Sequence, residues 1–116
     1  MKKFEDIIGW QHARVLCEKI YTLVKRDPFC QDFALRNQIT RASGSIMHNV
    51  AEGFGNESSA EFSRFLVYSI RSCSEVQSQL YIALDQNYLS QEEFNDLYAL
   101  AEETRKTISG LKRSLR

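Results

Sequence analysis

The chain has few residues that interrupt helices. Only one of its 116 residues is proline, and five are glycine. Proteins built from many short strands need frequent turns, and they use both residues for them. This scarcity argues against a β-sandwich or β-barrel and favours long, uninterrupted helices.

The chain also lacks a net charge and a long apolar run. Fifteen basic residues balance fifteen acidic residues, so no overall field attracts nucleic acid or an anionic membrane. No stretch approaches the roughly 18 apolar residues of a membrane span. Glu5 and Asp6 interrupt the N-terminal stretch, which therefore does not resemble a signal peptide. We expect no membrane association.

The chain has three cysteines, Cys17, Cys30 and Cys73. Their number is odd, and their spacing is not that of a metal site. This pattern indicates a reducing, cytoplasmic environment, with Cys17 and Cys73 as small core residues. Redox or metal chemistry is the alternative.

The inventory of catalytic residues is small. The two histidines, His12 and His48, lie in different predicted helices, and no Glu-x-x-His pair of a di-iron bundle occurs. Ser43-Gly44-Ser45 lies within a helical pattern and is not a nucleophile elbow. No glycine-rich phosphate loop is present. The sequence therefore predicts no enzyme, no catalytic residue, no metal, no cofactor and no small-molecule substrate.

Apolar residues recur every three or four positions in four segments, at about 8–26, 32–52, 59–86 and 91–113. This spacing is typical of amphipathic helices. Four apolar stripes joined by short links are buried together most simply in an antiparallel, up-down-up-down four-helix bundle. At 13.5 kDa the chain is expected to form one all-α domain over residues 1–116.

Local signals predict where these helices end. Asp27-Pro28 ends the first helix because proline disfavours a helical residue before it and has no amide hydrogen. Gly53 and Gly55 are expected to break the second helix. Ser90 and Glu93 have the spacing of a capping box at the start of the fourth.

A polar stripe runs beside the apolar stripe of the second helix. Its members are three or four residues apart: Gln38, Arg41, Ser45, Asn49 and Glu52. The third helix repeats the pattern with Tyr68, Ser72, Glu75 and Gln79. Hydrogen bonds between helices or between subunits explain such a stripe, with Arg41 paired to Glu75 or Glu52. A groove that contacts a small molecule or nucleic acid is the alternative.

The length of the third predicted helix points to self-association. At about 1.5 Å per residue it is roughly 40 Å long, more than the compact interior of such a small chain needs. We therefore expect burial against further copies of the chain in a homo-oligomer. The second and third helices would supply the surface, with Trp10 and Tyr88 as aromatic anchors.

The order of these residues forms a longer pattern. It comprises Trp10-Gln11, Gln38, Arg41-Ala42, Ser45, Asn49, Ala51-Glu52-Gly53, Ser58 (or Ser59), Glu61-Phe62, Ser72, Glu75 and Tyr88. This pattern resembles a family of small bacterial four-helix-bundle proteins, some encoded within intervening sequences of 23S ribosomal RNA genes. A related branch accompanies the reverse transcriptases of diversity-generating retroelements. One departure is Asn56, where the family usually has arginine. The resemblance implies a homopentameric ring and no established enzymatic activity.

The C-terminal stretch suggests a second function. It contains five cations and no acid: Arg105, Lys106, Lys112, Arg113 and Arg116. In a ring, these cations would gather into a basic rim that binds RNA or DNA in a salt-sensitive manner. Complementing the helix dipole is the simpler explanation. The sequence thus predicts a non-enzymatic oligomeric scaffold protein, with a weak RNA- or DNA-binding accessory protein as the alternative.

Overall fold

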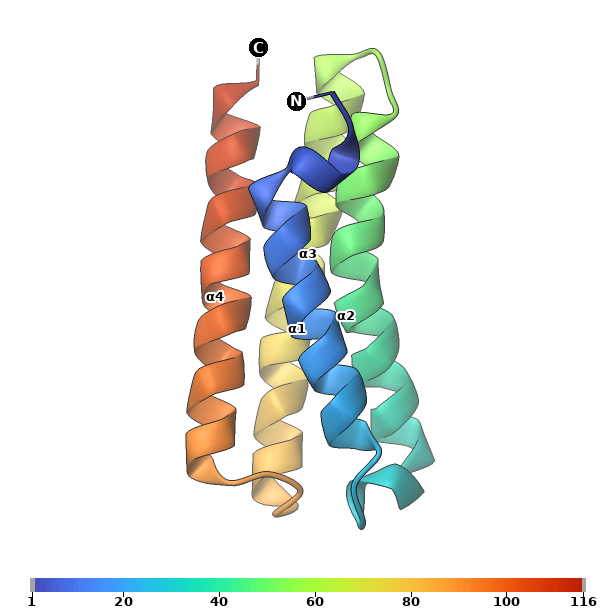
Figure 1. Cartoon of the computed structure of the whole chain (residues 1–116), viewed down its shortest axis with the longest axis vertical. Coiled ribbons are helices and arrows are strands. Elements are labelled where there is room, and N and C mark those ends of the chain that lie inside the picture. The colour runs from blue at the N-terminus through green and yellow to red at the C-terminus, as the bar shows by residue number, and fades with distance from the viewer. Residues whose placement is uncertain (1, 116) are drawn as a thin grey trace.

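The computed structural model describes residues 2–115, which contain four α-helices and two single-turn 3₁₀ helices. The α-helices are α1 (Ile8–Val24), α2 (Phe33–Phe54), α3 (Ser59–Asp85) and α4 (Gln91–Ser114); η1 (Phe4–Asp6) and η2 (Phe29–Gln31) are the short turns. In Figure 1 the chain descends along α1, ascends along α2, descends along α3 and ascends along α4. No strand occurs among the described residues. The predicted all-α, four-helix fold is confirmed.

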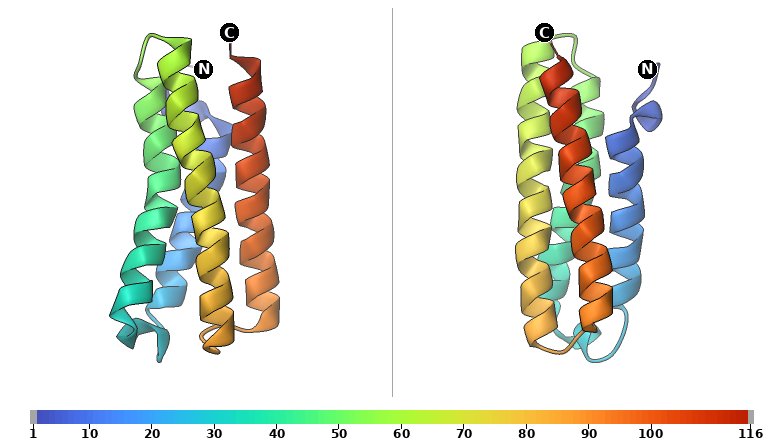
Figure 2. Two further views of the ribbon diagram at one scale, coloured as in Figure 1. Left: turned by 180° about the vertical axis from the view of Figure 1, so that it is seen from behind. Right: turned by 90° about the vertical axis from the view of Figure 1, so that its left-hand side faces the viewer.

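The bundle is elongated, with principal extents of 45 × 22 × 19 Å. Both views in Figure 2 place the N- and C-terminal regions at the same end as the link 55–58. We call this end the termini end. The links 25–32 and 86–90 lie at the opposite end, which we call the connection end (Figure 1). None of the helices within residues 2–115 has the length and apolar character needed to cross a membrane.

The core lies along the bundle axis and takes side chains from all four helices. The largest fully buried ones on the α-helices include Leu16, Ile20, Ile39, Ile46, Leu66, Leu80 and Ile108. Burial raises the pKa of the Cys73 thiol to about 12, so this cysteine stays protonated as a small core residue. Cys17, also predicted in the core, is only half-buried.

The helix ends follow from local side-chain caps. The carboxylate of Asp32 accepts from the amide of Leu35 at the start of α2, at 3.1 Å. The predicted capping box of α4 is present: Ser90 Oγ accepts from the amide of Glu93, and Glu93 accepts from the amide of Ser90. Helix α1 ends at Val24, two residues before the predicted Arg26, as the chain turns toward η2.

Gly53 does not break α2, contrary to the prediction. The helix continues through it to Phe54, and Gly55 follows as the C-cap. Gly53 is needed for close packing instead, because a Cβ there would lie 2.8 Å from Phe65 Cβ and 2.9 Å from Phe62 Cδ1. Carbon atoms pack at about 3.5–4.0 Å. The missing side chain therefore lets α2 approach the first turns of α3.

Gly53→Ala should consequently destabilise the fold although alanine favours helices. Crowding of this kind typically costs about 1–3 kcal/mol, against roughly 1 kcal/mol gained in helix propensity. Gly44→Ala is the matched control within α2, since its Cβ would meet only His48, at 3.5 Å. In thermal unfolding we expect Gly53→Ala to melt below the wild type and Gly44→Ala at or above it. Equal melting temperatures for both variants would contradict the packing described.

Candidate functional site

Serine and asparagine side chains form a hydrogen-bonded seam between α2 and α3. Ser69 Oγ donates to the carbonyl oxygen of Ile46 at 2.6 Å, and Ser72 Oγ donates to Ser45 Oγ at 3.0 Å. Asn49 Nδ2 donates to the carbonyl oxygen and to Oγ of Ser45, at 2.8 and 2.9 Å. We call Ser45, Asn49, Ser69 and Ser72 the polar seam.

The seam is shielded from water to different degrees. Ser69 and Ser72 are buried, whereas Ser45 and Asn49 are half-buried. A hydroxyl removed from water is tolerated when it finds a hydrogen-bond partner, and all four side chains have one. The inner part of the predicted polar stripe therefore links the two helices.

The outer part of the stripe faces solvent. Gln38, Arg41, Glu52 and Glu75 are all exposed. Within residues 2–115, Arg41 forms no ion pair, so its predicted pairing with Glu75 or Glu52 is not made inside one chain. We call these four residues, with the half-buried seam residues Ser45 and Asn49, the outer face of α2 and α3.

Gln79 lies beside this face with an incomplete set of hydrogen bonds. Its side chain is buried at 6% exposure, and Nε2 donates to Glu75 Oε2 at 3.4 Å. Its Oε1 atom is buried and accepts no hydrogen bond within the described chain. A buried amide oxygen without a donor is energetically unfavourable.

An arginine that sequence reasoning missed sits on α3 toward the termini end. Arg64 pairs with Glu61 at 2.6 Å and donates to Tyr68 Oη at 2.9 Å. Its guanidinium lies 5.0 Å from the ring centroid of Phe65. The hydrogen bonds to Arg64 lower the pKa of the Glu61 carboxyl. The Glu-x-x-Arg-x-x-x-Tyr spacing, three and four residues on one helix face, was the available signal.

Trp10 holds the N-terminal turn. Its ring packs edge-on against Phe4 at 5.2 Å between centroids, and the Arg14 guanidinium lies 6.0 Å from it. Gln11 Nε2 donates to the carbonyl oxygen of Glu5 at 2.9 Å. The predicted tryptophan-glutamine pair thus attaches η1 to α1.

Tyr88 is engaged inside the chain, and its role as an anchor between subunits stays a prediction. Its ring stacks on Phe29 at 4.7 Å, and its hydroxyl donates to Asp32 Oδ2 at 2.8 Å. That hydrogen bond raises the pKa of the Tyr88 phenol. Because Asp32 also caps α2, Tyr88 fastens the link 86–90 to the start of that helix.

A second contact closes the same end. Arg26 binds both carboxylate oxygens of Glu93, at 2.7 and 3.0 Å, and donates to the carbonyl oxygen of Tyr88 at 3.1 Å. Hydrogen bonds from Arg26, then from the Ser90 amide, lower the pKa of Glu93 to about 2. Together with the Tyr88 contacts, this pair forms what we call the connection-end lock.

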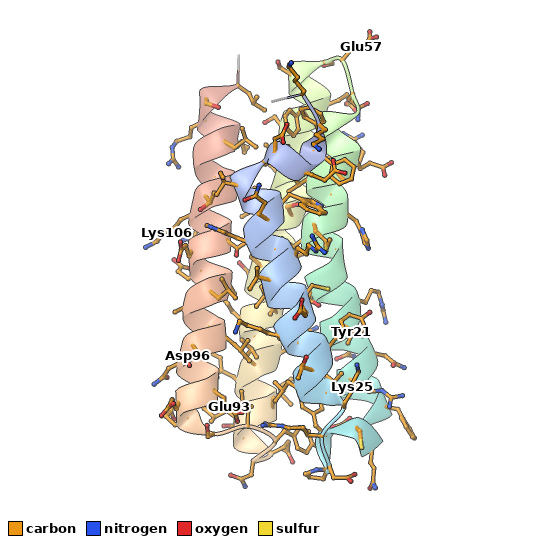
Figure 3. All side chains as sticks on the ribbon, viewed as in Figure 1. Tyr21, Lys25, Glu57, Glu93, Asp96 and Lys106 are labelled. Atoms are coloured by element: carbon orange, nitrogen blue, oxygen red, sulfur yellow. The ribbon has the colours of Figure 1, made fainter. Side chains whose placement is uncertain are left out.

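The cations of the predicted basic rim have different surroundings in the single chain. Arg105 is paired with Glu102 at 2.6 Å, because Glu102 lies one helical turn earlier. The pKa of Glu102 falls to about 2, chiefly through its hydrogen bond with Arg105 and next through that with Gln77. Lys106 and Arg113 are exposed, Lys112 is half-buried, and Arg116 lies outside the described residues. Figure 3 shows Lys106 extending from α4 away from the other helices.

The described residues contain no metal centre: within 2–115, no three His, Cys, Asp or Glu side chains are placed to hold a metal ion. His48 is exposed and His12 is half-buried, on α2 and α1 respectively.

Comparison with known proteins gives one family and one fold. The family model described as 23S rRNA-intervening sequence protein matches residues 5–110. A solved structure from Bacteroides thetaiotaomicron VPI-5482, described as a protein with unknown function from the S23 ribosomal protein family, superposes with a TM-score of 0.83. It shares 18% identity, and the match covers 92% of this chain and 100% of that one. That likeness shows the fold. No protein with a curated description matches the sequence.

The polar seam makes Asn49→Ala informative. The substitution removes both hydrogen bonds to Ser45, and we expect it to destabilise the fold by about 0.5–1.5 kcal/mol. Gln38→Ala is the control, because Gln38 is exposed on the same helix. Chemical denaturation measures both. If the midpoint of Asn49→Ala equals that of the wild type, the seam contributes nothing to stability.

The connection-end lock predicts a pH-dependent effect of Glu93→Gln. The pKa of Glu93 is lowered to about 2 from an ordinary 4.5. The ionised carboxylate therefore stabilises the folded state fully above pH 4.5, and this stabilisation is lost as pH falls toward 2. The side chains of Arg26 and Glu93 are 46% and 39% exposed, and water screens their attraction. We therefore expect the pair to contribute less than about 1 kcal/mol to the free energy of unfolding.

Melting curves should therefore show Glu93→Gln a few degrees below the wild type at pH 7, with the difference disappearing near pH 2. The neighbouring exposed Glu92→Gln serves as the control. A difference that stays constant with pH would contradict the assignment to the ionised pair.

Proposed function

The chain belongs to the 23S rRNA-intervening sequence protein family, and we propose that it is a non-enzymatic scaffold that assembles with copies of itself through the outer face of α2 and α3. The family match agrees with the resemblance in the sequence. The solved relative is itself described as having unknown function. The proposal therefore draws on the surface of this chain.

The observation that carries the proposal is the unused hydrogen-bonding capacity of the outer face. Arg41, Glu52 and Glu75 are exposed and make no ion pair within residues 2–115. Glu75 accepts one hydrogen bond, from Gln79, and keeps further acceptor capacity. A facing copy brings both signs of charge to the same surface, so it can pair with these exposed groups.

The dimensions of the bundle suit a ring. A stable contact covers about 800 Å² per partner, a fraction of the 6724 Å² that one chain exposes. If the α2 part of the outer face meets the α3 part of the same face on the next copy, the contact is heterologous, and its repetition closes a ring. We propose five copies, the number that the family resemblance implies.

The cytoplasm is the proposed location. Cys17, Cys30 and Cys73 are all free thiols in the structure. Free thiols persist in reducing compartments, whereas oxidising ones favour disulfides.

Weak RNA or DNA binding by the C-terminal rim is a second proposal. The exposure of Lys106 and Arg113 favours it, since both cations can reach phosphates. The pairing of Arg105 with Glu102 weakens it. In a ring, the remaining cations of neighbouring copies would add to one another.

Light scattering of the purified protein tests self-association directly. We expect a mass that is a multiple of the 13.5 kDa chain, fivefold for the proposed pentamer. Arg41→Glu should shift the mass toward the monomer, because it replaces a cation with an anion on a face that already carries Glu52 and Glu75. Combining it with Glu75→Arg or Glu52→Arg should restore the assembly, depending on which carboxylate is the partner.

Lys106→Glu is the matched control for charge reversal at an exposed cation outside the outer face. Circular dichroism checks that each variant remains helical. A wild-type monomer at micromolar concentration would reject the scaffold proposal. If Arg41→Glu and Lys106→Glu change the mass equally, the interface is not the outer face.

A further inference from the structure

A cleft opens between the end of α1 and the start of α2, near the connection end. Its volume is about 430 Å³, within the usual range of small-molecule sites. Tyr21 of α1 and Lys25, the residue that follows α1, line one side, and Arg36, Asn37 and Thr40 line it from α2. Figure 3 shows Tyr21 and Lys25 near the connection end.

The cleft carries positive charge without a compensating acid in its lining. Lys25 and Arg36 form no ion pair within residues 2–115. Arg36 is held in position, since Nη1 donates to the carbonyl oxygen of Cys30 at 2.8 Å and its guanidinium lies 4.8 Å from the Phe33 ring centroid. The nearby acid Asp27 lies in the adjacent link, where its Oδ1 accepts a hydrogen bond from the Cys30 thiol at 3.0 Å. A preformed arginine beside a free lysine is suited to a phosphate group.

The remaining lining suits a planar ring next to that phosphate. The Tyr21 side chain is 48% exposed, so a face of its ring is available for stacking. Thr40 Oγ1 donates to the carbonyl oxygen of Arg36 at 2.8 Å, which leaves its lone pairs free to accept. The exposed amide of Asn37 offers a donor and an acceptor at the same wall.

We propose that this cleft binds a nucleoside phosphate, with the phosphate between Lys25 and Arg36 and the base stacked on Tyr21. Asn37 and Thr40 would meet the polar edge of the base. The same chemistry is presented by a free nucleotide and by one unit of a single-stranded nucleic acid. The cleft lies between α1 and α2 and is independent of the outer face of α2 and α3.

Titration of the full chain with four probes tests the proposal: adenosine 5′-monophosphate, adenosine, inorganic phosphate and a single-stranded oligoadenylate. Amide chemical shifts in nuclear magnetic resonance locate the binding. We expect the monophosphate to bind more tightly than phosphate or adenosine alone, with the largest shifts at Asn37 and Thr40. If the oligoadenylate binds more tightly than the monophosphate, the ligand is a single strand. If the two bind equally, the ligand is a free nucleotide. Both results support nucleoside phosphate binding in the cleft.

Two variants of exposed residues keep the test specific. Tyr21→Ser should weaken monophosphate binding roughly 5- to 150-fold, the loss expected for one stacked base. Lys25→Gln should weaken it too and, with the oligoadenylate, reduce the logarithmic salt slope by about 0.7. Lys106→Gln and Arg113→Gln, in the C-terminal rim, should leave monophosphate binding unchanged. Arg36 is not substituted because it also supports the backbone at Cys30.

The proposal is overturned if neither the monophosphate nor the oligoadenylate binds, or if the shifts map outside the cleft. It is also overturned if inorganic phosphate binds as tightly as the monophosphate, since stacking on Tyr21 would then contribute nothing. Equal losses from Lys25→Gln and Lys106→Gln would reject the cleft and favour the rim.

Discussion

Two serine hydroxyls of α3 bond to α2 where these helices pack, Ser69 to the carbonyl oxygen of Ile46 and Ser72 to the hydroxyl of Ser45. Small side chains make this contact possible, and Gly53 continues it toward the link 55–58 by leaving no Cβ between α2 and α3. Buried hydroxyls are tolerated only when they are paired, so the bonds fix the register of one helix on the other. That register fixes which residues of α2 and α3 share the outer face.

The connection-end lock divides the molecule into surfaces with different roles. Tyr88 bonds to Asp32, and Arg26 bonds to Glu93 and to the carbonyl oxygen of Tyr88. These contacts hold both links of that end against the helices. They are consequently occupied within the chain, and the groups left for external contacts lie elsewhere. The outer face offers unpaired charges of both signs, which suits another copy of the chain. The cleft between α1 and α2 offers two cations and an exposed ring, which suits a phosphate ligand.

Much of the fold was predictable because helix periodicity and capping are local. The four apolar stripes and the Ser90–Glu93 capping box needed no knowledge of tertiary contacts. What could not be predicted are contacts that exist only in three dimensions. Gly53 was expected to end a helix, whereas its role depends on Phe62 and Phe65 of α3. Tyr88 finds Asp32 56 residues away, and the cleft needs residues from two helices. The sequence placed the polar stripe correctly on one side of α2 but did not separate its inner from its outer members.

Carboxyl labelling of the wild-type protein tests most directly whether the outer face is covered in solution. Glu75 and Glu103 are both exposed in a single chain, so a carbodiimide should modify them at similar rates in a monomer. At a concentration where the protein is assembled, our account predicts that Glu75 is modified several times more slowly than Glu103 and that dilution removes the difference. Equal modification of Glu75 and Glu103 in the assembled protein would contradict it.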